Sequence, residues 1–411
     1  MDYNQIQSLA AQHGSPYYLI DRSRFEGNFD ALTAAFQSRY SPLILAYSYK
    51  TNYIPYLCRI VRDKGGWAEV VSRTEYDLAL KIGCDPARII FNGPVKSPED
   101  IRRALDGGSI VNLDSDSEID AVLAYARAHP NRTVPIGLRI NIGLSDEAGV
   151  SHIQNRLTVG RFGFDPNTLA PVRRQLQAAD NIKVAALHGH TSTADRSTWC
   201  FKVITETLVH SAERLFADSV EMINIGGGMF GHIAPEHRWC EVPSFDDYAE
   251  AVCGVLNGSD WVARKKPTLV IEPGLAMVAD TLSFITQVVS VKQVRDKSFV
   301  TVDGSAFNTK PTFHAINPPH TIVYRSDTPA GEQTFDVVGA TCMEKDILLG
   351  GISAPLPSPG DFIRIDRIGA YTVVLTPPFI NPAPAILAQS NGRISCVRRR
   401  QSLDDMFAGY V

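Results

Sequence analysis

The sequence predicts an α/β protein in which a (β/α)8 TIM barrel is followed by a β-rich second domain. Two observations lead to this fold class. From about residue 43 to residue 272, short apolar, β-rich runs alternate with amphipathic segments of helical length, and after Gly274 this alternation stops. Alternating strands and helices indicate a parallel sheet, whereas successive strands with few helix patterns indicate a separate β domain.

The first part of the chain holds eight candidate strands, at residues 43–49, 67–71, 88–91, 109–113, 134–141, 183–187, 220–225 and 268–271. Segments of helical pattern separate them, such as residues 74–82, 98–106, 117–128, 166–179, 198–216 and 245–256. Eight βα units in roughly 250 residues suit the size of a (β/α)8 barrel. An open, doubly wound sheet is the alternative, because the number of strands does not prove that the sheet closes.

The rest of the chain is expected to be mainly strands, at residues 282–294, 299–302, 321–324, 334–338, 361–366, 371–375, 385–389 and 393–397. One more candidate strand, residues 17–20, precedes the barrel. We therefore expect a barrel domain at 26–275, a β-rich domain at 276–411, and an N-terminal segment at 1–25 that packs with the β-rich domain.

Composition excludes several classes of protein. The chain has 411 residues and 44% hydrophobic residues, enough for a large core. Its net charge of −4 indicates neither a nucleic-acid partner nor an anionic membrane surface. The seven cysteines include no Cys-x-x-Cys pair, which indicates a reducing compartment. With no signal-peptide pattern and no apolar run of membrane-spanning length, a cytoplasmic protein is expected.

The barrel prediction has a consequence for the polar residues of the sequence. Active sites of such barrels gather at the carboxyl ends of the strands. Polar residues and glycines stand in or directly after the predicted strands at Lys50, Glu69, Asn92, Arg139, His188, His190, Gly226, Gly227, Gly228 and Glu272. We therefore expect these residues to surround one site.

Lys50 is the most informative of these residues. A lysine at the end of an apolar strand can be partly desolvated, which favours the neutral amine that forms a Schiff base with an aldehyde such as pyridoxal phosphate. Taken alone, this segment favours a surface lysine that ends a strand.

The other strand ends supply what such a cofactor needs. Gly226–Gly228 is either an ordinary turn or a loop whose amides approach a phosphate, and Glu272 could form an ion pair or keep a pyridine nitrogen protonated. His190 could be a buried histidine or could stack on a flat ring. A metal site at His188 and His190 is not expected, because no carboxylate stands at an obvious ligand spacing.

These residues, in this order, resemble the fold-type III pyridoxal-phosphate decarboxylases, the family of diaminopimelate, ornithine and arginine decarboxylases. The resemblance runs from about Tyr17 to Asn381 and implies an alanine racemase-like barrel. The segment around Lys50 resembles the Schiff-base lysine motif of the family, and Glu69 matches an acid near that lysine. By the same resemblance, His190 stacks on the cofactor ring.

The resemblance also assigns the contacts of the phosphate and of the ring nitrogen. It implies that Thr193, Gly226–Gly228 and Tyr371 contact the phosphate and that Glu272 contacts the pyridine nitrogen. Arg139, at the end of a strand, is included among the cofactor-binding candidates.

The second domain resembles the family at a loop that contains Cys342. In the family this loop comes from the partner subunit, so the resemblance implies a head-to-tail homodimer with shared active sites. Cys342 would then be the acid that reprotonates the substrate carbon. Without the flanking motif, an inert cysteine would be the simpler interpretation.

The sequence departs from the family at the substrate end. Leu275 stands where the family usually has Arg after Glu-Pro-Gly, Lys310 begins the segment that usually starts with Arg, and Met343 replaces the Glu that follows the loop cysteine in diaminopimelate decarboxylases. Lysine cannot reproduce the two parallel hydrogen bonds that arginine makes to a carboxylate. The candidate substrate contacts are Lys310, His314, Glu344 and Asp346.

From these departures we expect a decarboxylase for a larger or differently charged amino acid, such as the citrate–diamino acid conjugate of a siderophore pathway. A diaminopimelate or basic amino-acid decarboxylase is the alternative. An amino-acid racemase is less expected, because alanine racemases place Arg rather than Glu against the ring nitrogen. A non-catalytic homologue is disfavoured by the retained Lys50, Glu272 and Cys342.

Overall fold

The computed structural model describes residues 1–233, 238, 240–313, 316–326 and 328–410. The chain divides into two compact units. The barrel unit comprises Asn28–Met277, and the β unit comprises Met1–Gly27 together with Val278–Val411.

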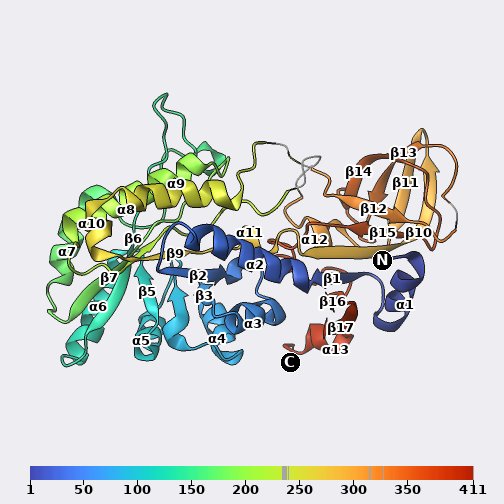
Figure 1. Ribbon diagram of the computed structural model, residues 1–411. Helices are drawn as coiled ribbons and strands as arrows, with labels where there is room; N and C mark the ends of the chain where they lie inside the picture. The colour runs from blue at the N-terminus through green and yellow to red at the C-terminus, as the bar shows by residue number, and fades with distance from the viewer. Residues whose placement is uncertain (234–237, 239, 314–315, 327, 411) are drawn as a thin grey trace. The chain divides into compact units, whose positions relative to one another are not determined.

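The barrel unit contains a closed barrel of eight parallel strands (Figure 1). In order around the barrel, these are β2 (Leu43–Ser48), β3 (Trp67–Val70), β4 (Ile89–Phe91), β5 (Ile110–Leu113), β6 (Val134–Arg139), β7 (Ile182–His188), β8 (Met222–Asn224) and β9 (Thr268–Ile271). The barrel closes where β9 pairs in parallel with β2, with Leu269 opposite Leu43. The predicted barrel is thus confirmed, and the open-sheet alternative is excluded.

Helices follow most of the strands along the chain. They are α2 (Arg22–Gln37), α3 (Pro55–Asp63), α4 (Arg73–Lys81), α5 (Pro98–Gly107), α6 (Asp116–Ala128), α7 (Leu169–Leu176), α8 (Thr198–Leu215), α9 (Phe245–Asn257), α10 (Asp260–Lys265) and α11 (Leu275–Val278). Serine caps begin several of them: Ser72 accepts a hydrogen bond from Glu75 N, and Ser97 and Ser244 form capping boxes.

Apolar side chains from several of the strands form the core of the barrel. Ala46, Ile90, Ile110, Ala186 and Val270 belong to one buried cluster. Because inward-pointing residues fill a barrel of this size, the carboxyl ends of its strands are left as the place for a site.

The β unit is built on a nine-stranded sheet. Its strands are β1 (Tyr17–Asp21), β10 (Leu282–Val294), β11 (Lys297–Val302), β12 (His320–Val323), β13 (Gln333–Val338), β14 (Ile347–Ala354), β15 (Phe362–Ile365), β16 (Ala385–Ser390) and β17 (Arg393–Arg398). Within the described residues, the helices α1 (Tyr3–His13), α12 (Ala306–Thr309) and α13 (Leu403–Phe407) accompany them.

The N-terminal strand β1 lies inside this sheet. It pairs antiparallel with β10 and parallel with β16. Its side chains Tyr17 and Leu19 join a core cluster with Ile285, Phe362 and Leu387.

The structure differs from the expected strands of the β unit in two places. Residues 371–375 form bends and turns rather than a strand, and Tyr371 has a positive φ of 56°, which a strand does not accommodate. Strand β14 was not expected, because Gly350 and Gly351 interrupt its apolar pattern. Within the described part of the chain, no helix is both long and apolar enough to span a membrane.

Candidate active site

Lys50 stands at the carboxyl end of β2, in a single 3-10 turn formed by Tyr49–Thr51. Strand β3 places Glu69 beside Ser48, and Lys50 Nζ lies 2.6 Å from Glu69 Oε2. The Glu69 side chain is fully buried, whereas 31% of the Lys50 side chain is exposed. The amine therefore reaches the barrel mouth, and the buried carboxylate stabilises a positive charge on it.

Asn92, directly after β4, connects the two carboxylates of the site. Its Nδ2 donates to Glu69 Oε1 at 2.9 Å and to Glu272 Oε1 at 2.8 Å. Its Oδ1 accepts a 2.7 Å hydrogen bond from Asn112 Nδ2, which fixes the orientation of the amide. Lys50, Glu69, Asn92 and Glu272 thus form one continuous row of contacts.

Glu272 follows β9 and is buried. Its Oε1 also accepts a 2.6 Å hydrogen bond from Asn224 Nδ2, and its Oε2 lies 3.2 Å from His188 Nε2. Burial acts to raise the pKa of Glu272, but the interactions with His188, Lys50 and Asn224 outweigh it and lower the pKa below its ordinary value. Glu272 is therefore an ionised carboxylate held in a fixed position.

The glycine segment Gly226–Gly228 follows β8 and admits no side chain at its first two positions. A Cβ on Gly226 would lie 2.6 Å from His190 Cβ, and a Cβ on Gly227 would lie 2.0 Å from the carbonyl oxygen of Glu272. Gly228 has a φ of +107°, which favours glycine. Arg196 Nη1 donates to the Gly228 carbonyl oxygen at 2.7 Å, which brings a guanidinium to this loop.

His190 lies against the glycine segment, where its Nδ1 accepts a 3.3 Å hydrogen bond from Gly227 N. Burial, followed by the charges of Lys50 and Arg139, lowers the pKa of His190 well below its ordinary value, so the ring is neutral. Arg139 Nη2 donates to the His190 carbonyl oxygen at 2.9 Å and holds this backbone in place. Thr193 is buried nearby, and its Oγ1 accepts a hydrogen bond from Arg196 N at 3.1 Å.

The residues at the barrel mouth fit pyridoxal phosphate. Lys50 offers an amine, and an ionised Glu272 suits a protonated ring nitrogen. A glycine loop beside Arg196 suits a phosphate, because close backbone approach and a guanidinium both favour an anion. The neutral ring of His190 suits stacking on a flat heterocycle.

The loop of Cys342 lies in the β unit, between β13 and β14, and Asp346 holds it. Asp346 Oδ2 accepts from Thr341 N at 3.0 Å, and Oδ1 accepts from Ala306 N at 2.7 Å. Asp346 is buried, whereas Cys342 and Glu344 are exposed. The structure therefore places Asp346 as the residue that holds the loop and leaves Glu344 as the accessible carboxylate.

The other predicted site residues of the β unit are Lys310, His314 and Tyr371. Lys310, at the end of α12, is buried, and burial lowers its pKa. Tyr371 is 41% exposed. His314 lies outside the described residues. The barrel-mouth residues and the Cys342 loop each assemble within their own unit.

Sequence reasoning missed the roles of Asn92, Asn224 and Arg196. The sequence marks Asn92 only as a polar residue after a strand, whereas the structure places its amide between two carboxylates. An asparagine inside an otherwise apolar strand was a usable signal for Asn224. Arg196 gives no signal in the sequence, because it follows no predicted strand end. In the structure it lies in a loop and has a positive φ of 54°.

Comparisons with known proteins agree with this geometry. Residues 26–279 match the family model of the pyridoxal-binding domain of the pyridoxal-dependent decarboxylases. The chain is 29% identical over 406 residues to a probable chloroplastic diaminopimelate decarboxylase of Oryza sativa subsp. japonica, covering 97% of this chain and 80% of that one. It is 27% identical over 411 residues to the diaminopimelate decarboxylase of Methanothermobacter thermautotrophicus, covering 98% and 92%.

A solved structure shows the same architecture. The crystal structure of the Helicobacter pylori diaminopimelate decarboxylase complexed with L-lysine superposes with a TM-score of 0.84 at 25% identity, covering 98% of both chains. The match of the family model over more than half of the chain, together with the lysine, glycine loop and glutamate at the barrel mouth, shows that this protein belongs to the fold-type III pyridoxal-phosphate-dependent amino-acid decarboxylases.

Proposed function

We propose that this protein removes the α-carboxylate of an amino acid that carries a further charged group at its far end. The observation that best supports this reaction is the row of contacts from Lys50 through Glu69 and Asn92 to Glu272. When bound, pyridoxal phosphate supplies the electron sink that accepts the electron pair left by departing CO₂. The protein's own groups hold that cofactor, orient the substrate and move protons.

The barrel-mouth residues divide this work. Lys50 holds the cofactor through its amine, and Glu69 fixes the position of that amine. Glu272 stabilises a proton on the ring nitrogen, because an ionised carboxylate favours a cation beside it. The neutral imidazole of His190 would stack on the cofactor ring, and Arg139 keeps the His190 backbone in place.

The phosphate would be held by the glycine loop and its neighbours. Gly226–Gly228 allow close backbone approach, Arg196 supplies positive charge, and Thr193 and Tyr371 supply hydroxyl groups. In a head-to-tail homodimer, the Cys342 loop of one subunit completes the site of the other. The Cys342 thiol then delivers a proton to the substrate carbon after CO₂ leaves.

The first candidate substrate is diaminopimelate. Relatives that carry this activity in their names align over nearly the whole chain, and the related Helicobacter pylori structure holds L-lysine. Glu344, exposed beside the cysteine, can contact a distal ammonium, whereas the oxygens of Asp346 are already occupied within the loop. This ranks diaminopimelate above the larger conjugate that the sequence alone favoured.

A larger amino-acid conjugate, such as a citrate–diamino acid adduct of a siderophore pathway, is the second candidate. It is supported by the replaced substrate-end residues: Leu275 offers no guanidinium, and Met343 offers no carboxylate. Lys310 is buried and cannot make the forked contact of an arginine.

The test is a CO₂-release assay of the purified protein with diaminopimelate, L-ornithine, L-arginine and a citrate–diaminopropionate conjugate. One of these should release one CO₂ per molecule consumed, and Lys50→Ala should abolish that release. Lys202→Ala, which alters an exposed lysine on α8, is the matched control. Borohydride reduction followed by mass analysis should place the cofactor on Lys50. Native turnover by Lys50→Ala would refute the central role of this lysine, and inversion without CO₂ would indicate a racemase.

A further inference from the structure

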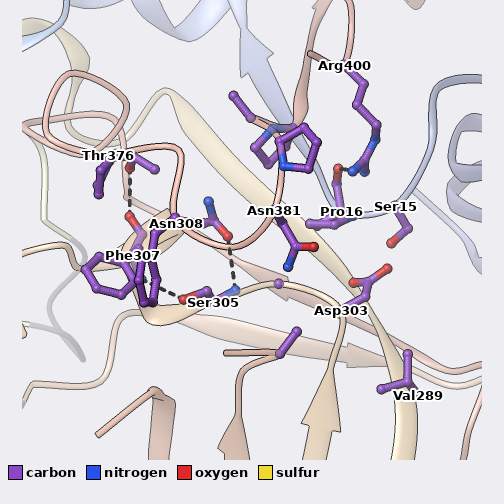
Figure 2. Close-up of a pocket in the computed structure, with 17 residues that line it drawn as sticks. Ser15, Pro16, Val289, Asp303, Ser305, Phe307, Asn308, Thr376, Asn381 and Arg400 are labelled. Carbon is purple, nitrogen blue, oxygen red and sulfur yellow. Dashed lines mark hydrogen bonds between the residues drawn. The ribbon is translucent and has the colours of Figure 1, made fainter. Parts of the chain in front are cut away.

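A cavity of about 300 Å³ lies wholly within the β unit (Figure 2). It is formed where the start of β1, the segment after β11 and the chain on either side of β16 and β17 come together. None of the residues assigned above to cofactor or substrate lines it. Its volume is at the lower end of the range for small-ligand sites.

Several polar groups of the cavity wall have unmet hydrogen-bonding capacity. Ser15 Oγ and Arg400 Nε are buried and make no hydrogen bond within the described chain. Asp303 Oδ1 accepts from Thr286 Oγ1 at 2.7 Å and from Gln287 N at 2.9 Å, and its second oxygen receives no such bond. Buried polar groups normally have partners, so the two buried exceptions at this cavity, Ser15 Oγ and Arg400 Nε, suit a polar molecule bound there.

The two charged groups of the wall are held in place without pairing with each other. Arg400 Nη2 donates to the Pro16 carbonyl oxygen at 2.8 Å, while Thr286 and Gln287 fix Asp303. No ion-pair contact joins Arg400 to Asp303, both of which are described residues, although the Asp303 charge acts on Arg400 through space. Figure 2 shows the Arg400, Asp303, Ser15 and Asn381 side chains around the same hollow.

The wall also has an apolar part, which includes Val289, Phe307 and Phe379. A fixed guanidinium, a fixed carboxylate and an apolar surface within one small cavity complement a molecule with a carboxylate, an ammonium and a short carbon chain. A free α-amino acid has these groups at a matching size.

We propose that this cavity is a second, non-catalytic site that binds a free α-amino acid as its zwitterion. The carboxylate of the amino acid contacts Arg400 and Ser15, its ammonium contacts Asp303, and its side chain packs against Phe307. Asn381 supplies an additional amide at the cavity wall.

The position of the cavity connects it to the substrate end of the proposed reaction. Phe307 and Asn308 line it and belong to α12, which Lys310 directly follows. Ala340, which also lines it, precedes the Cys342 loop, and Ser305 Oγ donates to Asp346 Oδ1 at 3.1 Å. A bound amino acid is therefore expected to change the rate of CO₂ release. This effect rests on the proposed function, whereas binding of the amino acid to the cavity does not.

The test screens the twenty standard L-amino acids against the holoenzyme by thermal shift, followed by calorimetry on those that stabilise it. Arg400→Gln should weaken binding by about 10- to 100-fold, because it removes a charge-assisted hydrogen bond. Arg399→Gln is the matched control, since the neighbouring Arg399 pairs with Asp405 and does not line the cavity. Asn381→Ala, a smaller change, should also weaken binding.

Amino-acid binding at the cavity should persist in Lys50→Ala. In the wild-type holoenzyme, it should leave the visible absorbance of the bound cofactor unchanged. Both results distinguish this binding from binding at the active site. The proposal is overturned if no amino acid binds, or if binding is unaffected by both Arg400→Gln and Asn381→Ala. It is also overturned if crystals soaked with the binding amino acid show only water in the cavity. Loss of CO₂ release with every substrate, by contrast, would refute only the proposed function.

Discussion

The buried carboxylates of Glu69 and Glu272 share one hydrogen-bond donor, since Asn92 Nδ2 lies 2.9 Å from Glu69 Oε1 and 2.8 Å from Glu272 Oε1. Two anions buried side by side repel each other unless donors stand between them. Under the proposed function, Asn92 lets Glu69 hold Lys50 while Glu272 is kept for a cofactor ring nitrogen.

Replacing Asn92 with Ala should disturb both carboxylates at once. We expect the free energy of unfolding to fall by about 1–3 kcal/mol, because each carboxylate loses a donor that water cannot readily replace. Cofactor affinity should fall as well. Urea unfolding and a pyridoxal-phosphate titration measure the two effects. Asn257→Ala, on the exposed end of α9, is the control and should leave cofactor affinity unchanged. Unchanged affinity in Asn92→Ala would contradict the shared-donor role.

Gly227→Ala should abolish cofactor binding without unfolding the barrel. The added Cβ would lie 2.0 Å from the Glu272 carbonyl oxygen, so the backbone of the loop must shift. Gly254→Ala is the matched control, since its Cβ would meet nothing within 4 Å in α9 and should stabilise the helix by about 0.5–1 kcal/mol. Absorbance titration with pyridoxal phosphate and far-UV circular dichroism separate the two outcomes. If Gly227→Ala bound pyridoxal phosphate with native affinity, cofactor binding would not depend on the close approach of Gly227 to the Glu272 carbonyl oxygen.

Much of the barrel and its mouth could be predicted because each strand is a local pattern. An apolar run followed by one polar residue is visible at Lys50 and at Glu272, and barrel closure brings all such strand ends to the same rim. Chain order alone therefore grouped these residues correctly.

What could not be predicted depends on contacts between distant segments. The sequence contains nothing that directs the Asn92 amide to two carboxylates, because that choice follows from strand register. The hydrogen bond from Ala306 N to Asp346 Oδ1 joins residues 40 positions apart, which the sequence does not reveal, and a contact of Asp346 with substrate stays a prediction. Tyr371 resembled part of a strand, and its positive φ is set by its surroundings rather than by its β propensity.

The protonation of Glu75 should make stability depend on pH. Glu75 is buried in α4, and burial raises its pKa from 4.5 to about 7 even though its Oε2 accepts a hydrogen bond from Val71 N. A carboxyl with a raised pKa binds more protons in the folded state. Its stabilising contribution is therefore full below about pH 4.5 and is lost as the pH rises through about 7.

Glu75→Gln should remove this dependence. Between pH 4.5 and 8, the wild type should lose on the order of 3 kcal/mol relative to the variant, in free energies of unfolding from urea titrations. Glu99→Gln, at an exposed position in the first turn of α5, is the control and should follow the wild type. Parallel pH profiles for Glu75→Gln and the wild type would show that Glu75 does not carry the effect.

Subunit mixing tests whether Lys50 and Cys342 of different chains act in one site. Lys50→Ala and Cys342→Ala homodimers should each be inactive or nearly so, because every site lacks one of the two groups. When both variants are co-expressed with different tags, heterodimers contain one intact site, and random pairing should restore about a quarter of the wild-type CO₂ release. Cys396→Ala, at another exposed cysteine of the β unit, is the control and should be fully active. If purified heterodimers remain inactive, or if Cys342→Ala alone is fully active, then Cys342 does not complete the partner's site.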